Sequence, residues 1–328
     1  MLKTKTVSNK SDNIKVVKEF FGKYYSYMTI VVLIIVFTSI NPSFLGIPNL
    51  RNLLSDTAPL LIMACGMTSV LLLGSIDLSV GATCSVANVM IVLLFPKIGV
   101  MAYPITMLFG LISGLLLGII HYKFKIPSFI ASLGFMGIVQ SLALLISPSS
   151  TSIPKKLQWI VGWSQKSVGL IGIPLILALF IVAIYYFLQS RTPYGINLYA
   201  IGGNERASRM AGLNIGFTKI LAFTLCGLCS SLGGIFLAAK LKSSSPIVGE
   251  SFTLLVVASV ALGGTALSGG KGSILGSVLG VFIVTIIRNG MGIIGIDVFW
   301  QNIVFGIVIL IAVSMTIDRR LTRNISVK

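Results

Sequence analysis

Apolar residues run along this chain in long stretches that are separated by short polar segments. Ten stretches approach the length of about 20 residues that a membrane-crossing helix needs. None shows the period-two alternation of a barrel strand. Because the bilayer core has no water to satisfy free backbone groups, the pattern predicts ten transmembrane helices in an all-α polytopic membrane protein. The expected spans are 27–46, 55–74, 79–95, 101–121, 127–147, 167–189, 216–240, 250–268, 272–290 and 296–316.

Polar residues frame these spans and divide the chain into three parts. We expect a basic cytoplasmic tail at 1–23, a single transmembrane domain at 24–318 and a second cytoplasmic tail at 319–328. Two connecting loops, 148–166 and 190–215, are long enough to carry structure of their own.

The basic residues predict the orientation in the membrane. With a cytoplasmic N-terminus and ten spans, 17 of the 25 lysines and arginines lie inside and eight outside, as the positive-inside rule expects. Removal of the weak span 79–95 changes the division to 13 against 12. Both termini should therefore be cytoplasmic. The eight outside residues are Arg51, Lys97, Lys155, Lys156, Lys166, Lys240, Lys242 and Arg288.

Composition supports the membrane interpretation and excludes other classes. Only 10% of the residues are charged and mean hydropathy is +0.99, whereas soluble domains carry about 25% charged residues. The net charge of +17 does not indicate nucleic-acid binding, because the basic residues end apolar runs instead of forming a polar face with aromatics. One histidine and eight acids do not form a catalytic constellation, and four cysteines in apolar segments indicate no metal site or cofactor.

Glycines recur inside the expected spans at four-residue spacing. Such rows let helix backbones approach closely, which favours helix packing within a membrane. The two rows are Gly110, Gly114, Gly118 and Gly272, Gly276, Gly280.

Two glycine-rich segments interrupt the apolar pattern at corresponding places. Residues 73–81 read Leu-Gly-Ser-Ile-Asp-Leu-Ser-Val-Gly, residues 262–270 read Leu-Gly-Gly-Thr-Ala-Leu-Ser-Gly-Gly, and five of nine positions agree. Broken helices often mark a transport pathway, because unwound backbone is tolerated only beside protein or water. This places Ser79, Thr265 and Ser268 among the candidate pathway residues. Two tight turns at the cytoplasmic surface would explain the same pattern.

Asp77 is a carboxylate inside the first interruption. At the bilayer centre it would cost ~2.5–3.5 kcal/mol, so it should face a cavity, a partner or an interface. It is a candidate for direct solute contact. It is also a candidate cap for the helix that starts near Ser79, where it would accept hydrogen bonds from free N–H groups.

The loop 190–215 contains a short cationic helix by its capping pattern. Asn204 suits the N-cap, Glu205 suits the positive first turn and Gly212 suits the stop. Arg206 and Arg209 are three residues apart and share a side. The segment fits docking onto a cytoplasmic motor, and it equally fits a helix solvated at the surface.

The sequence resembles the ribose-type sugar permeases of ATP-binding-cassette (ABC) importers. Residues 74–81 match the family's G-x-I-D-L-S-V-G motif, and similar motifs follow in order at 126–134, 199–212 and 262–276. The resemblance runs from about residue 40 to 318.

This resemblance implies a permease in the inner membrane of a bacterium. It implies three partners: a cytoplasmic ATPase, an extracytoplasmic sugar-binding protein and a second permease copy in a homodimer. It also implies that the helix from Asn204 to Gly212 couples to the ATPase. One departure concerns an acidic and aromatic cluster before the second glycine-rich segment, of which Glu250 and Phe252 are the remaining candidate pathway residues.

Two transport alternatives stay open at the level of sequence. The chain has no phosphate-binding G-x-x-x-x-G-K-[ST] element, so a partner must hydrolyse any ATP. A transporter driven by an ion gradient would also use broken helices, but it would need more ionisable residues in the bundle. The solute is expected to be a ribose-like monosaccharide, with a nucleoside or a furanosyl signalling molecule as the alternative.

Overall fold

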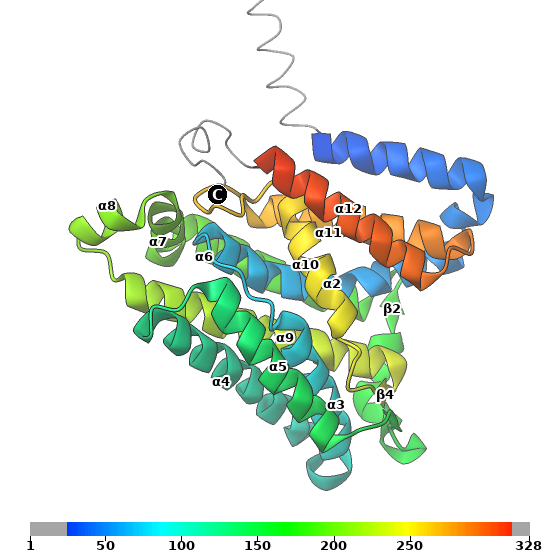
Figure 1. Ribbon diagram of the computed structural model, residues 1–328. Helices are drawn as coiled ribbons and strands as arrows, with labels where there is room; N and C mark the ends of the chain where they lie inside the picture. Colours follow the sequence, from blue (N-terminus) through cyan, green and yellow to red (C-terminus); the bar gives the residue numbers. More distant parts are fainter. Residues whose placement is uncertain (1–24, 317–328) are drawn as a thin grey trace, which may run out of the picture.

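The computed structural model describes residues 25–316, which fold into a bundle of helices (Figure 1). Six helical runs are long and apolar enough to cross a membrane, so the all-α polytopic class is confirmed. The count of ten spans and the side on which each terminus lies stay predictions. After a first helix at Tyr25–Ile40 come α2 (Ile47–Leu72), α3 (Val80–Ile98), α4 (Ala102–Lys123), α5 (Ser128–Ile146), α6 (Ile173–Arg191), α7 (Pro193–Gly203), α8 (Glu205–Met210), α9 (Ile215–Leu241), α10 (Glu250–Leu262), α11 (Ile274–Ile293) and α12 (Val298–Thr316).

Helix α2 lies at the centre of the bundle. From Thr57 to Leu72 every residue is buried, although the stretch includes polar side chains. Small residues allow this position: Gly66 faces Cys226 and Cys229 of α9 so closely that a Cβ would collide with them. In Figure 1, α4 and α5 form one flank of the bundle and α12 the opposite one, with α7 and α8 projecting at one end.

The first glycine row and two glycines of the second pack helices together as predicted, whereas Gly272 precedes α11 and lies against Thr265. Gly110, Gly114 and Gly118 bring α4 against α9, where added Cβ atoms would meet the α9 chain between Ile220 and Ser231. Gly276 and Gly280 bring α11 against α10, where the obstacles would be Gly263 and Ser259.

The remaining structure closes the end of the bundle opposite α8. Strand β1 (Thr151–Ser152) pairs antiparallel with β4 (Ser243–Ser244), and β2 (Ser167–Val168) pairs with β3 (Ile171–Gly172). Three 3₁₀ helices join the elements: η1 (Pro42–Leu45), η2 (Gly99–Met101) and η3 (Lys155–Gln165).

Helix α10 is shorter than its expected span. The apolar pattern predicted 250–268, whereas the helix has 13 residues and ends at Leu262. At 1.5 Å per residue it is about 20 Å long, too short for a hydrocarbon core of about 30 Å. Gly264 follows at a φ of 86°, which favours glycine and ends the helix at the start of the second glycine-rich segment.

Candidate functional site

The chain between α9 and α10 descends into the bundle beside α3. Ser245 N–H donates to Asn88 Oδ1 over 2.8 Å, and Gly249 N–H donates to Ser85 Oγ over 2.9 Å. Gly249 also packs against Gly81, so closely that a Cβ on either would strike the other's carbonyl oxygen. Helix α10 therefore begins at the depth of the first turn of α3.

That depth lies near the middle of the bundle. Asp77, two residues before the α3 N-cap Ser79, lies beside Cys226 of α9. Cys226 follows the start of α9 by 11 residues, or about 16 Å of helix. The first turn of α3 and the start of α10 thus lie level with the middle of α9, a helix of 27 residues.

Glu250 opens α10 at this depth, and its side chain is exposed. It borders a hollow of about 500 Å³ with Leu78, Ala82 and Gln140, and a second of about 360 Å³ with Asn302 and Phe305. No cationic group among the described residues forms an ion pair with it. Leu254, one turn along the same face, is 52% exposed.

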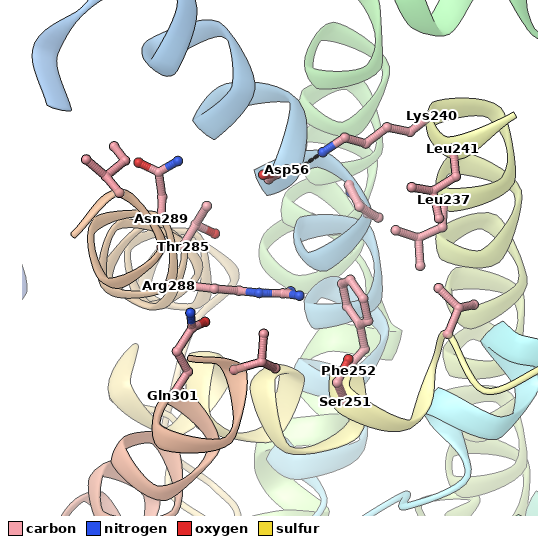
Figure 2. Close-up of a pocket in the computed structure, with 15 residues that line it drawn as sticks. Asp56, Leu237, Lys240, Leu241, Ser251, Phe252, Thr285, Arg288, Asn289 and Gln301 are labelled. Carbon is pink, nitrogen blue, oxygen red and sulfur yellow. Dashed lines mark ion pairs between the residues drawn. The ribbon is translucent and has the colours of Figure 1, made fainter. Parts of the chain in front are cut away.

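A larger hollow of about 530 Å³ adjoins the second of these at Ser251 (Figure 2). Arg288 of α11 lies over the Phe252 ring, with its guanidinium carbon 5.5 Å from the ring centroid. Lys240 of α9 forms an ion pair with Asp56 of α2 across the hollow. Thr285, Asn289 and Gln301 also line it. Asn289 and Asn49 exchange amide hydrogen bonds of 2.9 Å, which hold α11 against the start of α2.

The chemistry of this hollow suits a small polyhydroxylated solute. An aromatic face, a guanidinium, a carboxylate and amides together supply donors and acceptors for several hydroxyl groups. Sequence reasoning placed Phe252 among the pathway residues but missed Asp56, Lys240 and Arg288. A signal was present, since all three are ionisable residues within expected spans, where such residues mark functional sites.

Asp77 and Ser79 of the first interruption do not line these hollows, although Leu78 between them borders the one beside Glu250. Asp77 is 2% exposed, and its Oδ1 accepts from Ser79 N–H over 2.8 Å and from Ser79 Oγ over 2.6 Å. Ser79 is equally buried. The geometry directs the carboxylate to the backbone just before α3.

The second interruption packs directly against the first. Gly270 N–H donates to the Leu72 carbonyl over 2.9 Å, and Gly269 sits so close to Gly74 that a Cβ would strike its nitrogen. Thr265 is fully buried, with Gly272 against its side chain, while Ser268 is exposed. The structure thus brings the two breaks together, and Gly81 at the end of the first lies against Gly249, next to Glu250.

Helix α7 ties this pair of breaks to α8. Tyr199 OH donates to the Gly272 carbonyl over 2.8 Å. Gly202 fits against the Leu72 carbonyl and the Gly270 nitrogen, where no Cβ has room. A movement of α7 would therefore change its contacts with both glycine-rich segments.

Helix α8 begins and ends as its capping residues predict. Asn204 Oδ1 accepts from Ala207 N–H over 3.0 Å, and Gly212 takes a φ of 80° after the last turn. Arg206 and Met210 point outward, the latter 85% exposed. The opposite face of α8 turns toward α9, and there Glu205 forms an ion pair with Lys219.

The ion pairs of Glu205 set its protonation state. Partial burial raises its pKa, but Lys219 at 2.7 Å and Arg209 at 3.2 Å outweigh this, so the pKa is lowered overall. The carboxylate is charged at neutral pH. Because the folded pKa lies below the unfolded one, the contribution of these pairs is full above the ordinary pKa and is lost as pH falls through the lowered one.

Comparison with known proteins identifies the family of this chain. Residues 49–313 match the model of the family described as branched-chain amino acid transport system / permease component. The chain belongs to this family. It is a multi-pass permease of the bacterial inner membrane and not an enzyme.

Relatives within the family include sugar permeases. The ribose import permease protein RbsC of Haemophilus influenzae is 31% identical, over 94% of this chain and 96% of its own length. RbsC of Bacillus subtilis is 36% identical, over 90% and 92%. The D-allose transport system permease protein AlsC of Escherichia coli is 28% identical, over 93% and 94%. No solved structure matches the chain.

Proposed function

We propose that this permease is the membrane-spanning subunit of an ABC importer that carries a ribose-like monosaccharide into the cell. In this proposal two copies form a homodimer, a cytoplasmic ATPase drives them, and an extracytoplasmic binding protein delivers the sugar. The relatives named for ribose and allose import support the sugar class.

The exposed carboxylate of Glu250 carries the proposal. A charged side chain that faced lipid at the centre of the bilayer would cost ~2.5–3.5 kcal/mol. The exposed face of α10 therefore turns toward water or protein instead of lipid. A second copy placed against this face would enclose the hollows beside Glu250 and create a polar path along the interface.

The proposed path begins at the hollow around Phe252 and Arg288. Under the predicted topology, α2 starts and α9 ends on the extracytoplasmic side, so Asp56 and Lys240 mark the side where a binding protein docks. Solute released there meets hydrogen-bonding groups before it reaches Glu250 near the bilayer centre.

Helix α8 would receive the force of ATP hydrolysis at the opposite end. Its outward residues Arg206 and Met210 are free to enter a cleft of the ATPase. The contacts of Tyr199 and Gly202 in α7 would transmit a movement of α8 to the two packed glycine-rich segments. Asp77, Ser79, Thr265 and Ser268 then act in this proposal as part of the moving joint, not as solute ligands.

The test is reconstitution of the permease with its ATPase and binding protein in sealed vesicles that contain ATP. We expect uptake of labelled ribose that requires ATP and continues when proton and sodium gradients are dissipated. The ATPase with its catalytic glutamate replaced by glutamine is the control and should give no uptake.

Other outcomes would redirect the proposal. Accumulation driven by an ion gradient without ATP would identify a secondary transporter. ATP-dependent uptake of a nucleoside or a furanosyl signalling molecule, with ribose excluded, would keep the importer class and change the solute.

A further inference from the structure

A basic hollow lies at the end of the bundle where α4 ends, α8 packs and α9 begins. Its volume is about 530 Å³. Four cationic side chains line it, from Lys123, Lys125, Arg209 and Lys219, together with the single carboxylate of Glu205. The hollow is distinct from the one around Phe252 and Arg288, and the solute path proposed above does not use it.

The carboxylate does not neutralise the hollow. Both Glu205 oxygens are engaged, one by Arg209 at 3.2 Å and the other by Lys219 at 2.7 Å. Among residues 25–316, no acidic group lies within ion-pair distance of Lys123 or Lys125. Two ammonium groups therefore face the hollow without a counter-charge.

The backbone is shaped so that both lysines line the same space. Lys125 has a φ of 55°, in the left-handed region that non-glycine residues seldom occupy. His121 Nδ1 lies 2.7 Å from the Ile126 carbonyl oxygen and holds this turn against the end of α4. A simple solvated basic loop would not need this conformation.

The neighbours of the hollow place it at the edge of the bilayer. Phe124 between the two lysines is 69% exposed, and Phe129 and Ile130 at the start of α5 are 50% and 59% exposed. Exposed apolar side chains beside unpaired lysines are expected where hydrocarbon meets the headgroup layer. Basic pockets between membrane helices on the cytoplasmic side bind anionic headgroups.

We propose that this hollow binds a phosphate group, supplied by an anionic phospholipid of the inner leaflet or by free phosphate. Phosphate oxygens would accept hydrogen bonds from Lys123 and Lys125 and lie beside the Glu205–Lys219 pair. The ligand would then hold α8 against the end of α4. The inference rests on the cytoplasmic location of α8 in the proposed function, but not on the solute.

The test measures lipid retention by the full-length permease in mild detergent with native mass spectrometry. Phosphatidylglycerol, phosphatidylcholine and inorganic phosphate are titrated separately. We expect wild type to retain phosphatidylglycerol over phosphatidylcholine. Lys123→Gln with Lys125→Gln should weaken that retention about 30-fold, since each lysine contributes ~1 kcal/mol at an anionic surface. Lys155→Gln with Lys156→Gln, an exposed pair in η3, is the matched control and should retain the preference.

Each arm has a defined meaning. Binding of inorganic phosphate that is lost in the Lys123/Lys125 variant, with no preference between the lipids, would support the phosphate site and assign it to a free ligand. Equal retention of all probes by wild type, or an unchanged preference in the variant, would overturn the proposal. Because no arm measures uptake, failure here leaves the proposed transport function intact.

Discussion

Asp77 illustrates how the same residue suits two roles until its neighbours are known. The sequence allowed both solute contact and helix capping, since both need a carboxylate near the start of a helix. In the structure its Oδ1 accepts two hydrogen bonds from Ser79, and burial leaves it 2% exposed. These contacts favour the structural role, because a solute has no access to the carboxylate in this conformation.

Substitution of Asp77 separates the two roles. We expect Asp77→Asn to support near-normal uptake, because the amide oxygen can accept the same bonds from Ser79. Asp77→Ala should lose them and cost about 0.5–2 kcal/mol of stability. The measurement is initial uptake rate per folded transporter, with thermal stability recorded for each variant. Ser79→Ala, which loses only the hydroxyl bond, should lie between them. Equal, severe loss of uptake in Asp77→Asn and Asp77→Ala, with normal stability, would place the charge in the transport pathway.

At the scale of elements, the ends of α8 are determined by local capping, whereas its attachment to the bundle is determined by long-range contacts. Asn204 and Gly212 define its ends through hydrogen bonds and backbone conformation that depend on neighbouring residues only. Its attachment to the bundle instead depends on Lys219 in α9 and on the α7 glycine that fits between the two breaks. Residues within or next to α8 therefore determine where the helix begins and ends, whereas its position in the bundle depends on contacts with α7 and α9.

Charge reversal on α8 tests its docking role. Arg209→Glu replaces the exposed ion pair with Glu205, worth ~0.3–0.5 kcal/mol, by a repulsion, so the fold should tolerate it. We expect ATPase association and uptake to fall about tenfold or more, a loss of ~1.4 kcal/mol in docking. Co-purification with the ATPase and uptake are the two measurements. Arg191→Glu, at the end of α6, serves as the control for added negative charge. If Arg209→Glu associates and transports normally, α8 is a solvated surface helix.

At the scale of the whole molecule, orientation in the membrane can be read from two exposed positions. Met210 in α8 is 85% exposed and Trp159 in η3 is 70% exposed, at opposite ends of the bundle. The four native cysteines are buried and should not react. In intact cells an impermeant thiol reagent should label Trp159→Cys and leave Met210→Cys unlabelled until the cells are opened. The reverse pattern would invert the topology and place α8 outside.

The homodimer is tested by the exposed face of α10. Leu254→Cys should form a disulfide between two copies under mild oxidation in membranes, because the proposed interface brings this face of each copy together. Leu108→Cys on α4 is a matched control, since Leu108 is 53% exposed and Leu254 52% exposed. We expect cross-linked dimers for position 254 and monomers for position 108. Cross-linking at 108 alone would move the interface to the α4 flank and remove Glu250 from the path.

Local patterns in the sequence determined the membrane class, the helical architecture, both glycine-rich breaks and the ends of α8. Hydropathy, glycine spacing and capping act over a few residues, so each can be read without knowledge of the fold. The motifs also indicated the permease family. Only the tertiary structure brought the breaks together at Leu72 and Gly270, shortened α10 and gathered Asp56, Lys240 and Arg288 around one hollow. These features depend on which helix faces pack together, and that choice is made by contacts between residues as distant in the chain as Asp56 and Lys240.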